Sequence, residues 1–193
     1  MIKLEQIERV FDRIKTELNT DVLIAGGAIR DYLSKQKSYK DIDVFIRTET
    51  PQQFHDYCNQ LSKFYGLGTS LSNEQIEPAD YRSNPSIVEV VNFKVRFQTD
   101  LQLVGVRAAG PNFSEGVFKS FDFNINCSGF NETGIIDTPE AQLDRAIKTF
   151  TIRNVFSGHQ LVRLIEKYKR LTETKYPNFK LGYTKSAFHD HNS

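Results

Sequence analysis

The sequence predicts an α/β (α+β) fold, and three stretches of the chain carry this prediction. Residues 4–18 place apolar side chains at steps of three and four, as an amphipathic helix does. Residues 22–47 read as a buried strand, a Gly-Gly turn, a short helix and a second strand. Residues 87–95 and 97–106 read as two further strands. Helices and strands are therefore expected to pack in one domain, or in one domain with a small appendage.

The composition is that of a soluble globular protein. The chain has 193 residues, of which 39% are hydrophobic and 25% charged. No run approaches the ~18 apolar residues of a membrane span, and the charged amphipathic N-terminus is unlike a signal peptide. Cys58 and Cys127 lie far apart without metal-ligand spacing, which favours buried free thiols. A cytoplasmic protein with no membrane partner is expected.

Two aspartates in the second strand form the first candidate site. Asp41 and Asp43 are two residues apart, so on a strand they project from the same face, while Ile42, Val44 and Ile46 pack on the other. A carboxylate pair this close is costly unless a cation neutralises it. Mg²⁺, which prefers oxygen ligands, waters and substrate phosphates, is the natural candidate.

The glycine turn supplies a second half of the site. Gly26 and Gly27 have no side chains, so their backbone N–H groups can approach a phosphate, and the following helix adds its positive N-terminal end. A Gly-Gly alone is most often a tight turn, and a lone Asp-x-Asp is most often solvated surface. In this order, they indicate a nucleotide-using phosphoryl or nucleotidyl transfer site.

The two motifs together resemble a known family. GGAIRD (26–31) followed by DID (41–43) is similar to the GGxVRD and DxD signature of class II CCA-adding tRNA nucleotidyltransferases and bacterial poly(A) polymerases, in the polymerase-β-like superfamily. The resemblance implies a head domain at residues 1–138, with a mixed central sheet flanked by helices. A short helical neck and basic tail would follow at residues 139–193. The family's further helical domains do not follow, so CCA addition by this chain alone is not expected.

The helix and strands after DID raise the question of a third carboxylate. Thr50 has the character of an N-cap, with Pro51 in the first helical position. The polar stretch 68–85 is expected to be a flexible loop over the site. If strand 97–106 lies beside the DID strand, Asp100 is the third metal-facing carboxylate that the superfamily implies. Glu89 competes, because VEVVNFK resembles the family's VEVATFR, and Asp122 remains a third candidate.

Residues 120–130 (SFDFNINCSGF) are expected to form a buried strand after a short helix at 114–119. This strand resembles the family's RRDFTINALAY, which implies nucleotide-binding roles for Asp122, at the ribose, and for Asn126.

The same stretch also departs from the family pattern. Two arginines that contact the triphosphate in the family are Ser120 and Phe121 here. Lys119 and Arg30 are the candidates to replace them, although a lysine does not reproduce a bidentate arginine.

The helix at 158–174 resembles the family's base-reading helix, EDPxRxxRAxRFA. Gln160 replaces its aspartate and Arg163 keeps its first arginine; because glutamine is both donor and acceptor, the base preference is open. Between positions 163 and 185, seven basic residues stand against two acidic ones. This excess suits an RNA backbone, or simply a solvated helix face. His189 and His191 lie in a polar terminus and are not expected to bind a metal.

The leading hypothesis is a minimal magnesium-dependent nucleotidyltransferase that moves NMP from an NTP to an acceptor hydroxyl. Asp41, Asp43 and Asp100 would hold two Mg²⁺ ions, and Gly26, Gly27 and Arg30 the β and γ phosphates. An RNA 3′ end is slightly favoured over a protein or a small molecule as acceptor. The alternatives are a nucleotide-binding relative that has lost catalysis and an α/β domain in which the motifs are coincidental. The oligomeric state cannot be read from the sequence.

Overall fold

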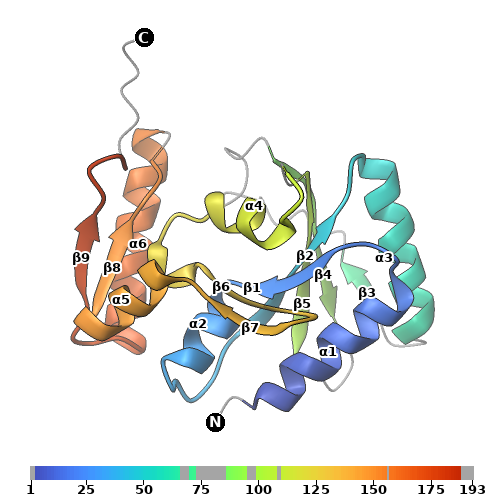
Figure 1. Cartoon of the computed structure of the whole chain (residues 1–193), viewed down its shortest axis with the longest axis horizontal. Helices are drawn as coiled ribbons and strands as arrows, with labels where there is room; N and C mark the ends of the chain where they lie inside the picture. Colours follow the sequence, from blue (N-terminus) through green and yellow to red (C-terminus); the bar gives the residue numbers. More distant parts are fainter. Residues whose placement is uncertain are drawn as a thin grey trace.

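A computed structural model describes residues 3–65, 70–72, 86–94, 99–107, 110–155 and 157–187 (Figure 1). The helices are α1 (Leu4–Glu17), α2 (Gly27–Leu33), α3 (Pro51–Tyr65), α4 (Phe113–Lys119), α5 (Pro139–Ile147) and α6 (Gly158–Thr174), with a 3₁₀ turn, η1 (Asn124–Asn126). The strands are β1 (Val22–Ala25), β2 (Asp41–Arg47), β3 (Ser70–Ser72), β4 (Ile87–Lys94), β5 (Asp100–Val106), β6 (Ser128–Asn131), β7 (Gly134–Asp137), β8 (Thr149–Ile152) and β9 (Lys180–Tyr183).

Seven of these strands form one mixed sheet. Their order is β3-β4-β5-β2-β1-β6-β7, in which β2 and β5 are parallel and the other neighbours are antiparallel. Helices flank the sheet, with α1 and α3 on one side and α4 on the other (Figure 1). This arrangement confirms the predicted α/β head fold.

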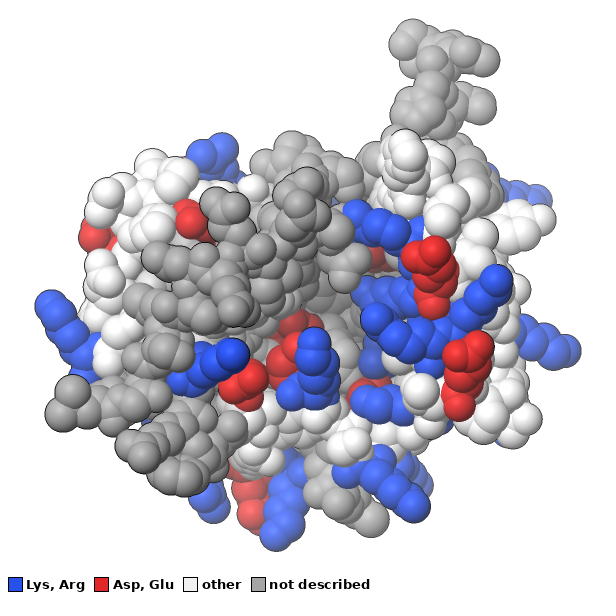
Figure 2. Space-filling model, turned by 180° about the vertical axis from the view of Figure 1, so that it is seen from behind, with Lys and Arg blue, Asp and Glu red and all other residues white. Residues whose placement is uncertain are grey.

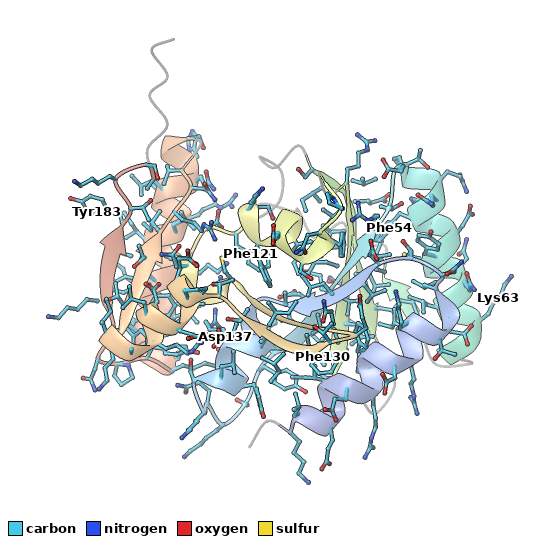
Figure 3. The ribbon with its side chains drawn as sticks, in the orientation of Figure 1. Phe54, Lys63, Phe121, Phe130, Asp137 and Tyr183 are labelled. Atoms are coloured by element: carbon cyan, nitrogen blue, oxygen red, sulfur yellow. The ribbon has the colours of Figure 1, made fainter. Side chains whose placement is uncertain are left out.

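Alternation along β2 divides its residues between two apolar clusters. Ile42, Val44 and Ile46 are buried with residues of α1 and α3. Phe45 points the other way, into a cluster with residues of α4, and its ring centroid is 5.4 Å from that of Phe121. Figure 3 labels Phe121 beside α4. Asp41 and Asp43 belong to the same face as Phe45, because they differ from it by even steps.

The segment after β7 forms a C-terminal unit of α5, β8, α6 and β9, on the left of Figure 1, which packs against the rest of the chain through Phe123 and Ala141. The strands β8 and β9 pair in parallel on either side of α6 in the sequence. Phe150 is fully buried and lies against the rings of Phe123, Tyr168, Tyr176 and Phe179. The expected short neck therefore contains a two-stranded sheet as well as helices.

The predicted strand over residues 120–130 is wrong in its first half. Only Ser128–Asn131 is a strand, and Asn124–Asn126 is a 3₁₀ turn. Phe123 bridges to Ile152 of β8 and buries its ring against the C-terminal unit, so the chain leaves the central sheet here.

Other local predictions have mixed outcomes. Thr50 caps α3 as predicted, its hydroxyl accepting a hydrogen bond from the backbone N–H of Gln53 at 3.1 Å. Of the predicted loop 68–85, Ser70–Ser72 forms β3, while most of the loop lies outside the described residues. His189 and His191 also lie outside them. Cys58 and Cys127 are buried and free, as predicted. No helix in the described ranges has the length and apolar character needed to cross a bilayer.

Candidate active site

Asp41 and Asp43 open onto a cavity of about 830 Å³ at the start of β2, beyond the point where Phe45 packs beside Phe121. This volume is in the range of small-molecule and cofactor sites. The cavity is lined by α2, β2, β4, β5, the segment before η1 and the polar face of α6. Its polar lining residues include Gly26, Gly27, Arg30, Asp31, Lys40, Asp41, Asp43, Asn92, Lys94, Asp100, Gln102, Asp122, Asn126, Gln160, Lys167, Arg170, Thr174 and Lys175.

The carboxyl group of Asp43 is strongly perturbed by its surroundings in this cavity. Burial, and then the nearby charge of Asp41, raise its pKa to about 7, although Lys167 and the backbone N–H of Gly27 favour its charged form. A pair of oxygen ligands with so much unfavourable charge fits a divalent cation such as Mg²⁺. The site predicted at Asp41 and Asp43 therefore has the chemistry that a metal would need.

Gly26 is tied to Asp43 by geometry as well as by sequence. Its φ of 81° lies in a region that favours glycine, and a Cβ placed there would lie 2.7 Å from Oδ2 of Asp43. The next residue, Gly27, begins α2, and its N–H donates to the Asp43 carboxylate. The glycine turn thus sits directly against the carboxylate pair, and both glycines line the cavity.

The position of β5 places two of the three candidates for a third carboxylate, Asp100 and Glu89, on different faces of the sheet. In the parallel pairing of β2 with β5, Asp41 is opposite Asp100 and Asp43 is opposite Gln102. Asp100 therefore shares their face and lines the cavity. Glu89 lies on the other side of the sheet, where its Oε2 is 2.8 Å from Nε2 of His55 on α3.

The structure does not bring three ligands together around one metal position. Within the described ranges, no group of three or more His, Cys, Asp or Glu side chains is placed to hold a metal ion. Asp100 remains a prediction as a third ligand, and Asp122 lies in the cavity lining on the segment before η1.

Arg30 is buried and held by its neighbours. Its Nε and Nη2 donate to Oδ1 of Asp31 at 2.8 and 2.7 Å, and its Nη1 donates to Oδ1 of Asn126 at 3.2 Å. Asp31 also pairs with Lys175, and it accepts a hydrogen bond from the hydroxyl of Tyr176 at 2.8 Å. Burial opposes the charge on Arg30, but the contacts with Asp31 and Tyr176 outweigh it and raise its pKa above the ordinary value.

Asn126 and Gln160, both predicted to bind nucleotide, are buried at the inner wall of the cavity. Nε2 of Gln160 donates to Oδ1 of Asp122 at 2.8 Å, which fixes the two side chains relative to each other. Ser157 caps α6 by accepting from the backbone N–H of Gln160 at 3.2 Å, which fixes the start of this helix.

Arg163, also predicted to bind nucleotide, is not among the cavity-lining residues, and neither is the exposed Lys119. The face of α6 that lines the cavity carries Gln160, Lys167 and Arg170. Motif matching missed Lys167 and Arg170. Helical spacing gives a partial signal, because Lys167 lies two turns after Gln160 and Arg170 lies three residues after Lys167, but the same spacing also favours Arg163.

Comparison with known proteins gives a family and a fold. The model of Gad2, the Gabija anti-defense 2 family protein, matches residues 1–141. No curated protein matches the chain.

Solved structures support the same fold. A CCA-adding enzyme in complex with CTP has a TM-score of 0.61 at 15% identity, covering 91% of this chain and 39% of its own. The Thermotoga maritima CCA-adding enzyme complexed with tRNA has a TM-score of 0.60 at 15% identity, covering 93% and 39%. A tRNA-processing enzyme has a TM-score of 0.57 at 20% identity, covering 95% and 44%. The chain therefore shares its fold with part of these CCA-adding and tRNA-processing enzymes, and it spans less than half the length of these structures.

Proposed function

The chain belongs to the Gabija anti-defense 2 family, and we propose that it is a nucleotidyltransferase that moves a nucleoside monophosphate from an NTP to an acceptor hydroxyl. One observation carries the proposal. Asp41 and Asp43 lie on one face of β2, against the Gly26–Gly27 turn, in a cavity large enough for a nucleotide. The likeness in fold to CCA-adding enzymes supports it.

Asp41 and Asp43 would hold Mg²⁺, with two ions and a contribution from Asp100 as the fuller proposal. When bound, the metal would lower the pKa of the attacking hydroxyl and stabilise the departing pyrophosphate. In the transfer, the acceptor oxygen forms a bond to the α-phosphorus as the bond between that phosphorus and the pyrophosphate breaks.

The chain's own contribution is to position the two substrates. Gly26 and Gly27 keep the floor beside the carboxylates free of side chains, so that phosphates can approach the backbone. Asp122 and Asn126 line the inner wall, where the nucleoside would lie. Positioning and charge neutralisation carry most of the rate in such reactions.

An RNA 3′ end is the first candidate acceptor. The basic residues of α6 and the segment after it suit a phosphate backbone, and solved structures with this fold include an enzyme complexed with tRNA. The family name supports a second candidate: it describes action against a defence called Gabija, so a component of that defence is the other acceptor to test.

A nucleotide-binding protein without catalysis is the alternative from a different class. It is favoured by Ser120 and Phe121, which stand where the family that the motifs resemble has arginines. The intact GGAIRD and DID motifs favour an enzyme instead.

The test is transfer of label from each of the four α-labelled NTPs, with Mg²⁺ and a pool of small RNAs. The Asp41→Ala/Asp43→Ala variant is the control. We expect labelled RNA and pyrophosphate only with the intact carboxylates. Label on added protein with unlabelled RNA would keep the reaction and change the acceptor. Nucleotide binding with neither labelled product nor pyrophosphate would support the binding protein and overturn the proposed activity.

A further inference from the structure

Two cations on α6 face the carboxylates across the cavity. Lys167 and Arg170 are three residues apart, about 5–6 Å between Cβ atoms on one helix face. Both line the cavity, and the charge of Lys167 acts on Asp43 from the opposite wall. We call them the α6 cation pair. Figure 2 shows the corresponding face, with acidic side chains near its centre and basic ones gathered beside them over α6.

Two other cations of the cavity, Arg30 and Lys175, are already engaged. Arg30 is bound by Asp31, Asn126 and Tyr176, and Lys175 pairs with Asp31 and donates to the carbonyl of Ser38 at 2.8 Å. A phosphate could recruit either group only at the expense of these contacts. Such exchange is costly, because a buried charge that loses its partner pays the full desolvation penalty.

The α6 cation pair has no comparable commitment. Across the part of the chain that the structure describes, neither Lys167 nor Arg170 has a carboxylate within the 4.0 Å of an ion pair. Their side chains line the cavity beside that of Leu171, which also packs with Leu164 in the apolar cluster that anchors the helix in the C-terminal unit.

The arrangement of charge matches one kind of ligand. A metal-bound triphosphate presents a cationic side, at the metal, and an anionic side, at the phosphate oxygens outside the metal's coordination. The carboxylates of Asp41 and Asp43 form one wall of the cavity, and Lys167 and Arg170 form the facing wall. Arginine and lysine are the usual phosphate-binding side chains, and charge-assisted hydrogen bonds to phosphate are among the strong ones.

We propose that Lys167 and Arg170 bind the β and γ phosphates of the NTP, replacing the arginines that this sequence lacks at positions 120 and 121. This inference rests on the proposed nucleotidyltransferase function and identifies where that site takes its triphosphate. The helix α6 then reads the phosphates, which all four NTPs share. Gln160, in the first turn of the same helix, is left to contact the nucleoside.

Binding by the protein of an ATP analogue with a non-transferable α,β-methylene bridge, measured by calorimetry with Mg²⁺, tests the proposal. In the Lys167→Gln/Arg170→Gln variant, we expect at least about a tenfold loss of affinity for the analogue and unchanged affinity for AMP, which lacks the β and γ phosphates. Glutamine keeps the side-chain stems and polarity, so folding is preserved, and thermal melting checks this.

The matched control is Lys169→Gln/Lys180→Gln. It removes the same charge from exposed positions, one on α6 and one on β9, and neither residue lines the cavity. We expect its affinity for the analogue to equal that of the unmodified protein. An equal loss in both double variants would show a general charge effect and overturn the assignment.

Failure of this inference and failure of the proposed function give different results. Unchanged analogue affinity in Lys167→Gln/Arg170→Gln, with labelled product still formed, would overturn the inference alone. Selective loss of analogue affinity in a protein that forms no product would support the inference and overturn catalysis. Absence of analogue binding by the unmodified protein would overturn both. Phosphate could also come from the backbone of an RNA acceptor, so binding of an RNA oligonucleotide is measured without NTP. If Lys167→Gln/Arg170→Gln loses RNA binding but keeps analogue binding, the α6 cation pair binds the acceptor and not the NTP.

Discussion

The hydroxyl of Tyr176 donates a 2.8 Å hydrogen bond to Asp31, a residue 145 positions earlier in the chain. This contact joins the helix of the glycine motif to the segment that follows α6. Because Asp31 also holds Arg30 and Lys175, the position of Arg30 depends on the C-terminal unit as well as on the sheet.

Replacing Tyr176 with phenylalanine tests this connection. The ring contacts with Phe150 and Phe179 remain, but Asp31 loses a donor, and the contact between Arg30 Nε and the hydroxyl, 3.2 Å, is lost. We expect the free energy of unfolding in urea to fall by about 1–2 kcal/mol. Tyr183→Phe is the control. Its side chain is 71% exposed, so removing the hydroxyl there should change the free energy of unfolding little. Equal effects of the two changes would show that the buried hydrogen bonds are not important for stability.

Gly26→Ala should lower the stability of the protein by more than the replacement of another glycine that has a positive φ. Gly134→Ala is the reference, since Gly134 has a φ of 97° and a Cβ added there would meet nothing within 4 Å. Both variants should lose about 1–3 kcal/mol from backbone strain. Only Gly26→Ala also crowds Oδ2 of Asp43, so it should lose more stability in urea and lose nucleotide binding as well. Equal losses of stability, with nucleotide binding retained, would contradict the close contact with Asp43.

The raised pKa of Asp43 predicts a pH-dependent stability in the metal-free protein. Its pKa rises from 3.8 to about 7 on folding, so the folded state binds the proton more tightly than the unfolded state does. The contribution of Asp43 to the free energy of unfolding is therefore fully present below pH 4. It is lost as the pH rises from 4 to 7 and does not change further above pH 7. The difference of about 3 pKa units sets an upper limit of about 4 kcal/mol on this contribution to the free energy of unfolding.

Asp43→Asn removes this titration. In a chelating buffer, we expect the variant to unfold at higher urea concentration than the unmodified protein at pH 8 and at the same concentration near pH 4. Asp100→Asn is the control, because that residue is exposed. A constant difference between Asp43→Asn and the unmodified protein across this pH range would contradict the assigned pKa.

Asp100 and Glu89 give opposite predictions for catalysis. Asp100 is opposite Asp41 on the cavity face, whereas Glu89 pairs with His55 on the other face. We expect Asp100→Asn to lower the rate of nucleotide transfer by about 10–100-fold, the range typical of lost support at a metal site, and Glu89→Gln to leave the rate unchanged. A large loss of transfer rate in Glu89→Gln, with an unchanged rate in Asp100→Asn, would favour Glu89 over Asp100 as the third carboxylate.

Much of the site was predictable because it depends on short-range geometry. The two-residue period of a strand places Asp41 and Asp43 together, and the Gly-Gly pair marks the turn beside them. The choice between Asp100 and Glu89 was not predictable in the same way. Alternation separates the two faces of each strand, but it does not say which face of a strand joins which face of its neighbour.

Contacts between distant segments were the part that the sequence did not reveal. Strands β8 and β9 have four residues each, too few for a periodic pattern to stand out. Nothing local to Lys175 or Tyr176 indicates Asp31 as their partner. Lys167 and Arg170 were visible only as part of a basic stretch, because helical spacing from Gln160 favours Arg163 as well and does not by itself select the residues that line the cavity.

The helix α6 contributes both to the apolar cluster of the C-terminal unit and to the cavity lining, and this links two properties of the protein. Leu164 and Leu171 pack in the C-terminal cluster, and Leu171 also lines the cavity together with Lys167 and Arg170. A ligand that binds this part of the cavity can do so only when the helix is docked, so its binding free energy is added to the stability of the C-terminal unit. Conversely, any change that loosens the packing around Phe150 lowers the fraction of molecules able to bind, and so weakens the apparent affinity without touching the ligand.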